Sequence, residues 1–396
     1  MDVRRSANRC LLDMLMLMLM LMLMLMQLKF TSECTMKIGI LTGGGDCPGL
    51  NAVIRAVTQT AMREYGATVM GIEDGFEGLV DGRWRQLGER DVNGIIGLGG
   101  TILGTSNRGD PWHYPVRLPD GSYEIQDRSQ DVLNNFRKMG VDVVLATGGD
   151  GTMNIAKRLI DHGMPVIGVP KTIDNDLSAT DQTFGFDTAS QIVCEAIDRL
   201  STTASSHQRV MVIEVMGRYA GWIALHGGMA GGADMILVPE IAFSWEHVFA
   251  NLQNRQKNRH RFSIVCIAEG AHLPEGGEVI RELDNRRTDA KQLGGIGAVV
   301  AKRIEEGTGI ETRVTVLGHL QRGGSPTAFD RLLATRYGTA AARLACTGQF
   351  GVMVSSRHGE IKAVPIKDAI AKTRTVSLDN DLVMAARSLG VSFGNE

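Results

Sequence analysis

Residues 170–176, Pro-Lys-Thr-Ile-Asp-Asn-Asp, concentrate groups that can do chemistry. They offer two carboxylates, an amide, a hydroxyl and a lysine amine, and they directly follow an apolar run, 165–169, that predicts a short buried strand. In open α/β sheets, ligands bind in the crevice beyond the carboxyl ends of the strands. The stretch therefore predicts a binding site, although a capped turn, in which Asp and Asn bond to the backbone, accounts for the same residues.

Two glycine-rich turns upstream are suited to phosphate. In each, an apolar run that predicts a strand (37–42 and 141–146) leads into glycines (43–49 and 147–152) and then into a helical pattern. Glycine exposes backbone N–H groups at a helix N-terminus, where the helix dipole favours an anion. The first turn matches neither the P-loop nor the dinucleotide-binding pattern, and a plain tight turn is the alternative.

Asp150 stands inside the second of these turns. A carboxylate is poorly suited to direct contact with phosphate, but it can hold Mg²⁺, which bridges phosphates while keeping several waters. The alternative is a helix N-cap, a position that Asp also favours. A further glycine loop, 99–108, ends in the cation of Arg108.

Arginines flank the strands that the later sequence predicts, each near a glycine-bearing turn. They are Arg209, Arg218, Arg313 and Arg322. Guanidinium groups match phosphate oxygens in bidentate pairs, so the four together predict a site for a phosphorylated ligand. Any one of them alone is more often an ordinary surface arginine, so the prediction depends on their joint placement.

The elements that must position these residues alternate between strand and helix. Apolar runs predict strands over 210–215, 235–238, 261–268 and 313–317, and helical patterns cover 50–65, 188–200 and 219–230. Residues 270–297 are polar and glycine-rich and predict a surface excursion. This alternation predicts an α/β fold with mostly parallel sheets, arranged as two Rossmann-like, three-layer α/β/α domains.

Composition narrows the class of protein. The 396 residues are 43% hydrophobic and 22% charged, which suits a globular chain with two domains. The net charge of −2 argues against a nucleic-acid-binding surface. Cysteines at 10, 34, 47, 194, 266 and 346 show neither metal-ligand spacing nor a disulfide framework, which favours a reduced, cytoplasmic location.

The N-terminal residues follow a different pattern from the rest. Arg4, Arg5 and Arg9 precede a strict alternation of Met and Leu from Met14 to Met26. The arrangement is similar to a signal peptide, but no cleavage site follows and the run is short for a membrane span. We therefore expect residues 1–35 to be an unstructured extension or a misassigned start, with Met36 beginning the folded protein, and we expect no membrane association.

Seven motifs, in order, make the chain similar to the 6-phosphofructokinase family. They are GGGDCPGLNA from Gly43, GGTILGTS from Gly99, GGDGT from Gly148, PKTIDND from Pro170, SSHQR from Ser205, EVMGR from Glu214 and GHLQRGGSP from Gly318. The resemblance implies Mg²⁺-assisted transfer of the terminal phosphoryl group of ATP to the 1-hydroxyl of fructose 6-phosphate. It also implies a homodimer or homotetramer whose active sites are shared between subunits.

The resemblance further implies domains and residue roles. A donor-binding domain would comprise 36–185 and about 322–348, and a sugar-phosphate-binding domain 186–321 and about 349–396. Asp174 would be the general base, assisted by Lys171 and Arg218. The donor would contact Gly45, Arg108, Gly149, Asp150, Gly151 and Thr152, with Asp150 also holding Mg²⁺. The sugar phosphate would contact Thr172, Ile173, Asp174, Met216, Gly217, Arg218, Glu240, His319, Leu320, Gln321 and Arg322, with Arg209 and Arg313 supplied by a neighbouring subunit.

Two positions predict different phosphoryl donors. Gly151 matches ATP users of the family, because the smallest residue leaves room for the α-phosphate, whereas pyrophosphate users resemble this loop with Asp. Lys171 matches pyrophosphate users, since ATP users of the best-known bacterial type carry glycine there. The combination resembles the family's mixed-substrate group. We expect ATP, because steric and like-charge exclusion is hard to evade; pyrophosphate dependence and a catalytically silent regulatory subunit are the alternatives.

Overall fold

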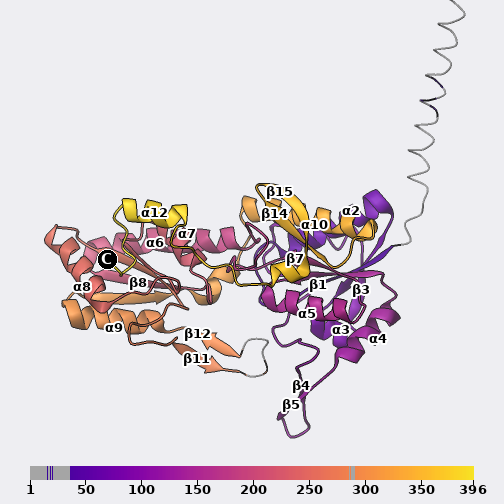
Figure 1. The fold of residues 1–396 in the computed structure, drawn as a ribbon, viewed down its shortest axis with the longest axis horizontal. Coiled ribbons are helices and arrows are strands. Elements are labelled where there is room, and N and C mark those ends of the chain that lie inside the picture. Colours follow the sequence, from indigo (N-terminus) through magenta and orange to yellow (C-terminus); the bar gives the residue numbers. More distant parts are fainter. Residues whose placement is uncertain (1–15, 17, 19, 21–35, 285, 287–289) are drawn as a thin grey trace, which may run out of the picture.

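The computed structural model describes residues 16, 18, 20, 36–284, 286 and 290–396. The expectations for the N-terminal extension therefore fall almost wholly outside the described residues. From residue 36 the chain forms two lobes, each with a β-sheet covered by helices (Figure 1). The predicted α/β fold with mostly parallel sheets is confirmed. None of the helices described is long and apolar enough to cross a membrane.

The first lobe is built on a seven-stranded sheet. In spatial order its strands are β15 (Glu360–Pro365), β14 (Val352–Arg357), β7 (Val166–Pro170), β6 (Val143–Gly148), β1 (Lys37–Thr42), β2 (Thr68–Ile72) and β3 (Trp84–Leu87). The edge strands β15 and β3 pair antiparallel, and the pairs between them are parallel. Its helices are α2 (Leu50–Tyr65), α3 (Phe76–Asp81), α4 (Ser129–Met139), α5 (Asp150–Asp161), α10 (Ala328–Cys346) and α11 (Ile366–Ala369).

The second lobe is built on a parallel sheet of four strands. Their spatial order is β13 (Thr312–Val316), β8 (Val210–Val215), β10 (Ser263–Ala268) and β9 (Met235–Leu237). Its helices are α6 (Phe186–His207), α7 (Trp222–Ala230), α8 (Trp245–Lys257), α9 (Ile296–Thr308) and α12 (Asp381–Ser388). Short 3₁₀ helices occur at η1 (Ile95–Gly97) and η2 (Gly318–Arg322).

The central strands are apolar throughout because helices cover both faces of each sheet. In β6, Val143 and Leu145 join the core on one face, whereas Val144 and Ala146 join the core on the other. The first of these cores continues into the second lobe, where it takes up alternate residues of β8 and β10. One continuous apolar layer therefore holds the two sheets together and fixes the carboxyl ends of their strands.

Two expectations about the elements require correction. Residues 349–396 do not form one part of the second domain, because β14 pairs with β7 and β15 pairs with β14 in the first-lobe sheet. Only the end of the chain belongs to the second lobe, where Ser392 bridges to Met235. Helix α6 also extends to His207, seven residues beyond the predicted helix over 188–200.

Two antiparallel hairpins project from the same side of the two lobes (Figure 1). The first lobe carries β4 (Tyr114–Arg117) and β5 (Tyr123–Gln126). The second carries β11 (Ile280–Leu283) and β12 (Lys291–Leu293), within the predicted surface excursion. The guanidinium carbon of Arg286 lies 5.0 Å from the ring centre of Tyr123, so the hairpins meet.

Candidate active site

The loop after β7 holds the predicted carboxylates in a fixed conformation. Asp174 is 5% exposed; its backbone N–H donates to Thr172 Oγ1 at 3.0 Å, and the same hydroxyl lies 3.3 Å from Asp174 Oδ2. Asn175 has a left-handed backbone (φ 53°), and its side-chain oxygen accepts a hydrogen bond from the backbone N–H of Thr183. The stretch is thus a buried loop in which Thr172 and Asn175 bond to the backbone, while Oδ1 of Asp174 has no hydrogen-bond partner in the described structure.

Lys171 and Arg322 join this loop to the glycine turn after β1. Lys171 is 3% exposed and donates through Nζ to the carbonyl oxygen of Gly45. Arg322, in η2, donates to the carbonyl oxygen of Asp46 at 3.2 Å. A Cβ atom on residue 45 would lie 2.8 Å from the Arg322 guanidinium, so glycine allows this close approach. Burial lowers the pKa of Lys171, and repulsion from Arg322 adds to that effect.

The N-terminus of α5 adds a carboxylate to the same region. Asp150 is the first residue of the helix, and its Oδ1 accepts a hydrogen bond from Asn154 at 3.0 Å. Partial burial raises the pKa of Asp150, while the charge of Arg218 acts in the opposite direction. Because Arg218 follows β8, this interaction brings together groups from both lobes, at the carboxyl ends of β6 and β8.

Asp176 shares the same electrostatic environment. Burial raises the pKa of its carboxyl group; repulsion by Asp174 adds to the rise, and attraction to Arg218 opposes it. Sequence reasoning noted this carboxylate but gave it no role. Its position two residues after Asp174 in the same buried loop marks it as part of the site.

Glu269 is a site residue that sequence reasoning missed. It follows β10, its Oε1 accepts a hydrogen bond from the backbone N–H of Arg218 at 3.3 Å, and burial raises its pKa to about 7, with repulsion by Asp174 as a further cause. A Cβ atom on Gly270 would lie 1.7 Å from the Arg218 carbonyl oxygen, so only glycine permits this packing. The available signal was an acidic residue directly after a predicted strand, the same signal that identified Asp174.

Glu240, by contrast, serves the backbone. Its Oε1 accepts hydrogen bonds from the N–H groups of Gly221 at 2.9 Å and Val376 at 2.8 Å, and its Oε2 lies 3.2 Å from the same Gly221 nitrogen. The carboxylate thus joins the N-terminus of α7 to the C-terminal segment. These bonds occupy much of the capacity that a sugar ligand would need.

The other residues that were predicted to contact the sugar phosphate differ in their position and in how accessible their side chains are. Thr172 precedes the buried carboxylate, and Met216 and Gly217 follow β8 directly. Ile173 is fully buried in the core, which leaves only its peptide group for a ligand. In η2, Gln321 is fully buried and donates to the Gly318 carbonyl, whereas Leu320 is 69% exposed. The segment containing His319 is therefore a 3₁₀ turn whose Arg322 faces the glycine loop.

The carboxylates are compatible with a magnesium ion. No group of three or more potential ligands gathers anywhere in the described ranges. Mg²⁺ at phosphate sites needs only one or two carboxylates besides phosphate oxygens and water. Oδ1 of Asp174 and Oδ1 of Asp176 are buried without a hydrogen-bond partner in the described structure, and Asp150 faces the same environment. These residues fit the ion.

Arg108, at the end of the glycine loop 99–108, forms an ion pair with a carboxylate of the second lobe. Arg108 NH2 lies 3.0 Å from Oδ2 of Asp284, which follows β11 and is 7% exposed. Asp284 also accepts hydrogen bonds from Arg286 at 2.7 and 3.0 Å. The hydrogen bonds from Arg286 are the main cause of the lowered pKa of Asp284. Arg108, which was predicted to contact the phosphoryl donor, is therefore paired with a carboxylate of the second-lobe hairpin.

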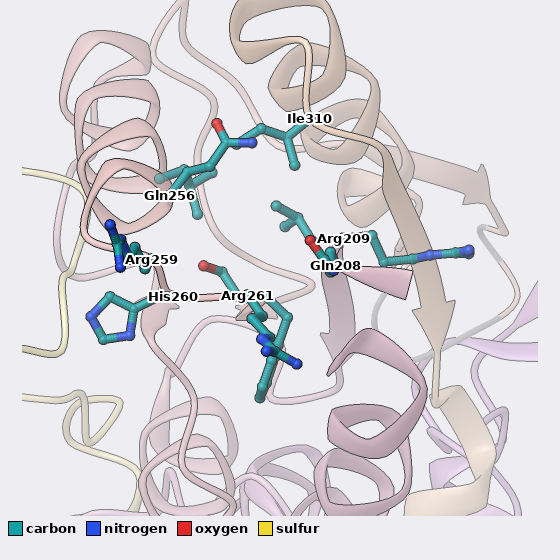
Figure 2. Close-up of a pocket in the computed structure, with 11 residues that line it drawn as sticks. Gln208, Arg209, Gln256, Arg259, His260, Arg261 and Ile310 are labelled. Carbon is teal, nitrogen blue, oxygen red and sulfur yellow. The ribbon is translucent and has the colours of Figure 1, made fainter. Parts of the chain in front are cut away.

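Arg209 and Arg313 lie at the amino ends of the strands β8 and β13, away from the carboxyl ends where the other site residues gather. Arg209 directly precedes β8, and Arg313 is the second residue of β13. Both guanidinium groups pair with Glu311, that of Arg209 at 3.4 Å and that of Arg313 at 2.6 Å. The six residues of β8, which rise ~3.3 Å each, separate Arg209 from Met216 by about 20 Å. A pocket of about 450 Å³ lies beside the amino end of β8, and Figure 2 shows Arg209, Arg259, His260 and Arg261 around it.

The fold and the site place the chain among two-lobed α/β proteins whose ligands bind beyond the carboxyl ends of parallel strands. A family model described as phosphofructokinase matches residues 37–345. The chain therefore belongs to the phosphofructokinase family.

Individual relatives agree with this assignment but differ in donor. The chain is 51% identical over 361 residues to the ATP-dependent 6-phosphofructokinase of Chloroflexus aurantiacus, covering 91% of this chain and 98% of that protein. It is 49% identical over 342 residues to the pyrophosphate–fructose 6-phosphate 1-phosphotransferase of Streptomyces coelicolor, covering 86% and 96%. The structure is similar to that of Pichia pastoris phosphofructokinase in the T-state (TM-score 0.72, 30% identity), covering 90% of this chain and 37% of that one.

Proposed function

We propose that the protein is an ATP-dependent 6-phosphofructokinase, which transfers the terminal phosphoryl group of ATP to the 1-hydroxyl of fructose 6-phosphate. The proposal rests on charged residues that follow strands of both lobes: Lys171 and Asp174 after β7, and Arg218 after β8, whose charge acts on Asp176 in the same loop. The chain is also 51% identical to a protein of that name. A silent regulatory subunit is disfavoured, because these residues would have no reason to be assembled.

Asp174 is the proposed general base. Its Oδ1 has no hydrogen-bond partner in the described structure, so it can accept the proton of the sugar 1-hydroxyl as that oxygen attacks the terminal phosphorus. Lys171 and Arg218 would neutralise charge on the transferred group, the main contribution that proteins make to phosphoryl transfer. Asp150 would hold Mg²⁺, which when bound supplies further charge neutralisation.

Pyrophosphate is the second candidate donor. Lys171 favours it, since a buried cation beside the glycine loop can bind the compact anion, and a relative named for pyrophosphate is nearly as similar as those named for ATP. Gly151, at the N-terminus of α5, favours ATP, because it brings no side chain and no charge toward an α-phosphate.

We further propose that the active site is completed by a second copy of this chain, in a homodimer or homotetramer. Arg209 and Arg313 lie too far from the carboxyl-end site to act within their own chain. Strand β13, which carries Arg313, is an edge strand with Val314 38% and Val316 54% exposed. An apolar edge of this kind suits contact with another subunit. The cytoplasmic location stays a prediction.

Initial rates with fructose 6-phosphate decide the donor, measured with ATP and with pyrophosphate at matched saturation and with Mg²⁺ present. We expect faster turnover with ATP, and faster turnover with pyrophosphate would reverse the assignment. Asp174→Asn should leave sugar-phosphate binding intact while lowering kcat at least about 100-fold, as loss of general-base assistance does. Near-normal kcat in that variant would remove Asp174 from this role.

A further inference from the structure

The segment after α11 crosses over the loop that carries the catalytic carboxylates. Ser178 N–H donates to the Ala369 carbonyl at 3.1 Å, and Ser178 Oγ donates to the Lys372 carbonyl at 2.5 Å. Further along, the backbone N–H of Arg374 donates to the carbonyl oxygen of Asp176 at 2.7 Å. Residues 369–374 therefore run beside the loop and hold it through its main chain.

Arg374 also contacts the loop through its side chain. Its NH1 donates to the carbonyl oxygen of Asn175 at 3.1 Å, while its own N–H holds the next carbonyl, that of Asp176. Asn175 is the left-handed residue between the two carboxylates, so its peptide orientation sets the directions in which Asp174 and Asp176 leave the loop. One residue thus holds two consecutive peptide groups at the turning point of the loop.

Arg374 is itself fixed by the second lobe. Its guanidinium carbon lies 4.3 Å from the ring centre of Trp222, and the Trp222 indole N–H donates to the Arg374 carbonyl at 2.9 Å. Trp222 is 5% exposed and begins α7, which follows the Arg218 turn. A cation stacked on a buried indole has little freedom to move away, so the contact joins the first-lobe loop to the second-lobe helix.

We propose that Arg374 is a positioning residue for phosphoryl transfer: it fixes the peptide groups of Asn175 and Asp176 and so aims the two neighbouring carboxylates. This role rests on the proposed function. Arg374 lies beyond residues 37–345, where the family model matches, so nothing in that match assigns it a part in the site. It acts through backbone carbonyls and touches no reacting atom.

The test compares Arg374→Ala with Arg374→Lys and with Arg387→Ala in the full chain. Arg387 is a matched control, because it also stacks on a ring, that of Phe393 at 5.7 Å, but lies in α12 and pairs with Glu396. A displacement of about 1 Å at reacting groups can cost about 100-fold in rate. We expect Arg374→Ala to lower kcat about 10- to 100-fold with KM values for both substrates changed less than about threefold, Arg374→Lys to recover part of the loss, and Arg387→Ala to match wild type.

Amide hydrogen exchange of peptides covering 172–184, measured without substrates, supplies an independent readout. We expect faster exchange in Arg374→Ala, including at the Thr183 amide that is bonded to Asn175, and unchanged exchange in Arg387→Ala. Equal kcat in the two alanine variants, or a lower kcat with unchanged loop exchange, would overturn the proposal. If wild type phosphorylates fructose 6-phosphate with neither donor, the proposed function fails, while the exchange comparison still decides whether Arg374 holds the loop.

If Arg374→Ala does not fold, Trp222→Phe takes its place. Phenylalanine keeps an aromatic face for the guanidinium but removes the indole N–H that holds the Arg374 carbonyl. We expect a smaller loss of kcat in the same direction, with faster exchange over 172–184. Wild-type kcat and exchange in both Trp222→Phe and Arg374→Lys would overturn the proposal.

Discussion

Lys171 donates through Nζ to the carbonyl oxygen of Gly45, which joins the loop after β7 to the loop after β1. Lys171 is 3% exposed, and burial lowers the pKa of its amine. Its cation therefore stands at the junction of the carboxylate loop and the proposed donor loop. In the proposed function, this position would let one lysine bind the phosphoryl donor while its bond to Gly45 joins the two loops.

Lys171→Gly should impair pyrophosphate use more than ATP use. Pyrophosphate has no nucleoside to bind elsewhere, so it depends more on the local cation, and loss of one preorganised donor group commonly costs about 100-fold in kcat. We expect roughly that loss with pyrophosphate and about tenfold or less with ATP, from initial rates. Lys157→Gly, which removes an exposed lysine from α5, is the control. Equal losses with the two donors would contradict this account.

Gly151→Asp should impair ATP use more than pyrophosphate use. The residue lies in the first turn of α5, where an added carboxylate would occupy space and place a negative charge near the α-phosphate of ATP. We expect kcat/KM for ATP to fall at least about tenfold, with a smaller loss for pyrophosphate, because like-charge contacts in a poorly solvated site are costly. A uniform loss for both donors would show that steric and charge exclusion at residue 151 does not select the donor.

The sequence predicted local elements better than it predicted their partners. Strands 37–42 and 210–215 have the predicted bounds, because continuous apolar runs between turns determine buried strands. The placement of β14 beside β7 depends on a pairing across about half the chain, which no local pattern encodes.

The same holds for the residues of the candidate site: those that follow a predicted strand could be predicted, and those placed only by folding could not. Asp174 was predicted because it follows an apolar strand, and Glu269 gives the same signal after β10. Arg374 gives no such signal, since its side chain acts on backbone carbonyls whose position only the folded chain determines.

Glu269→Gln and Glu240→Gln should show which of the two carboxylates contributes to binding of fructose 6-phosphate. Glu269 stands beside Asp174 and Arg218, so we expect its substitution to raise KM for fructose 6-phosphate about tenfold, the cost of losing a charge-assisted hydrogen bond. Glu240→Gln should leave that KM unchanged and lower the Tm, because an amide cannot replace both acceptors of the Gly221 and Val376 N–H groups. A raised KM in Glu240→Gln but not in Glu269→Gln would support the sugar-phosphate contact predicted for Glu240.

The raised pKa of Glu269 also predicts a pH dependence of stability. Its pKa rises from 4.5 to about 7 on folding, so the folded protein holds this proton more tightly than the unfolded chain. Its contribution to the free energy of unfolding is therefore lost as the pH rises from about 4.5 to about 7. We expect Glu269→Gln to have a higher Tm than wild type at about pH 8, with the difference shrinking toward about pH 5. A difference that grows toward low pH would contradict the assigned shift.

Asp284→Asn should strengthen donor binding. Asp284 pairs with Arg108 at 3.0 Å, and a donor phosphate would compete for the same guanidinium. Partly exposed ion pairs are weak, so we expect KM for the donor to fall only about two- to fivefold, with a smaller effect in high salt, where such pairs are screened. Glu278→Gln is the control, because Glu278 pairs with Lys291 at the base of the same hairpin. If Asp284 instead holds Arg108 in its binding position, KM for the donor will rise in Asp284→Asn and not in Glu278→Gln, which would show that the pair assists the donor and does not compete with it.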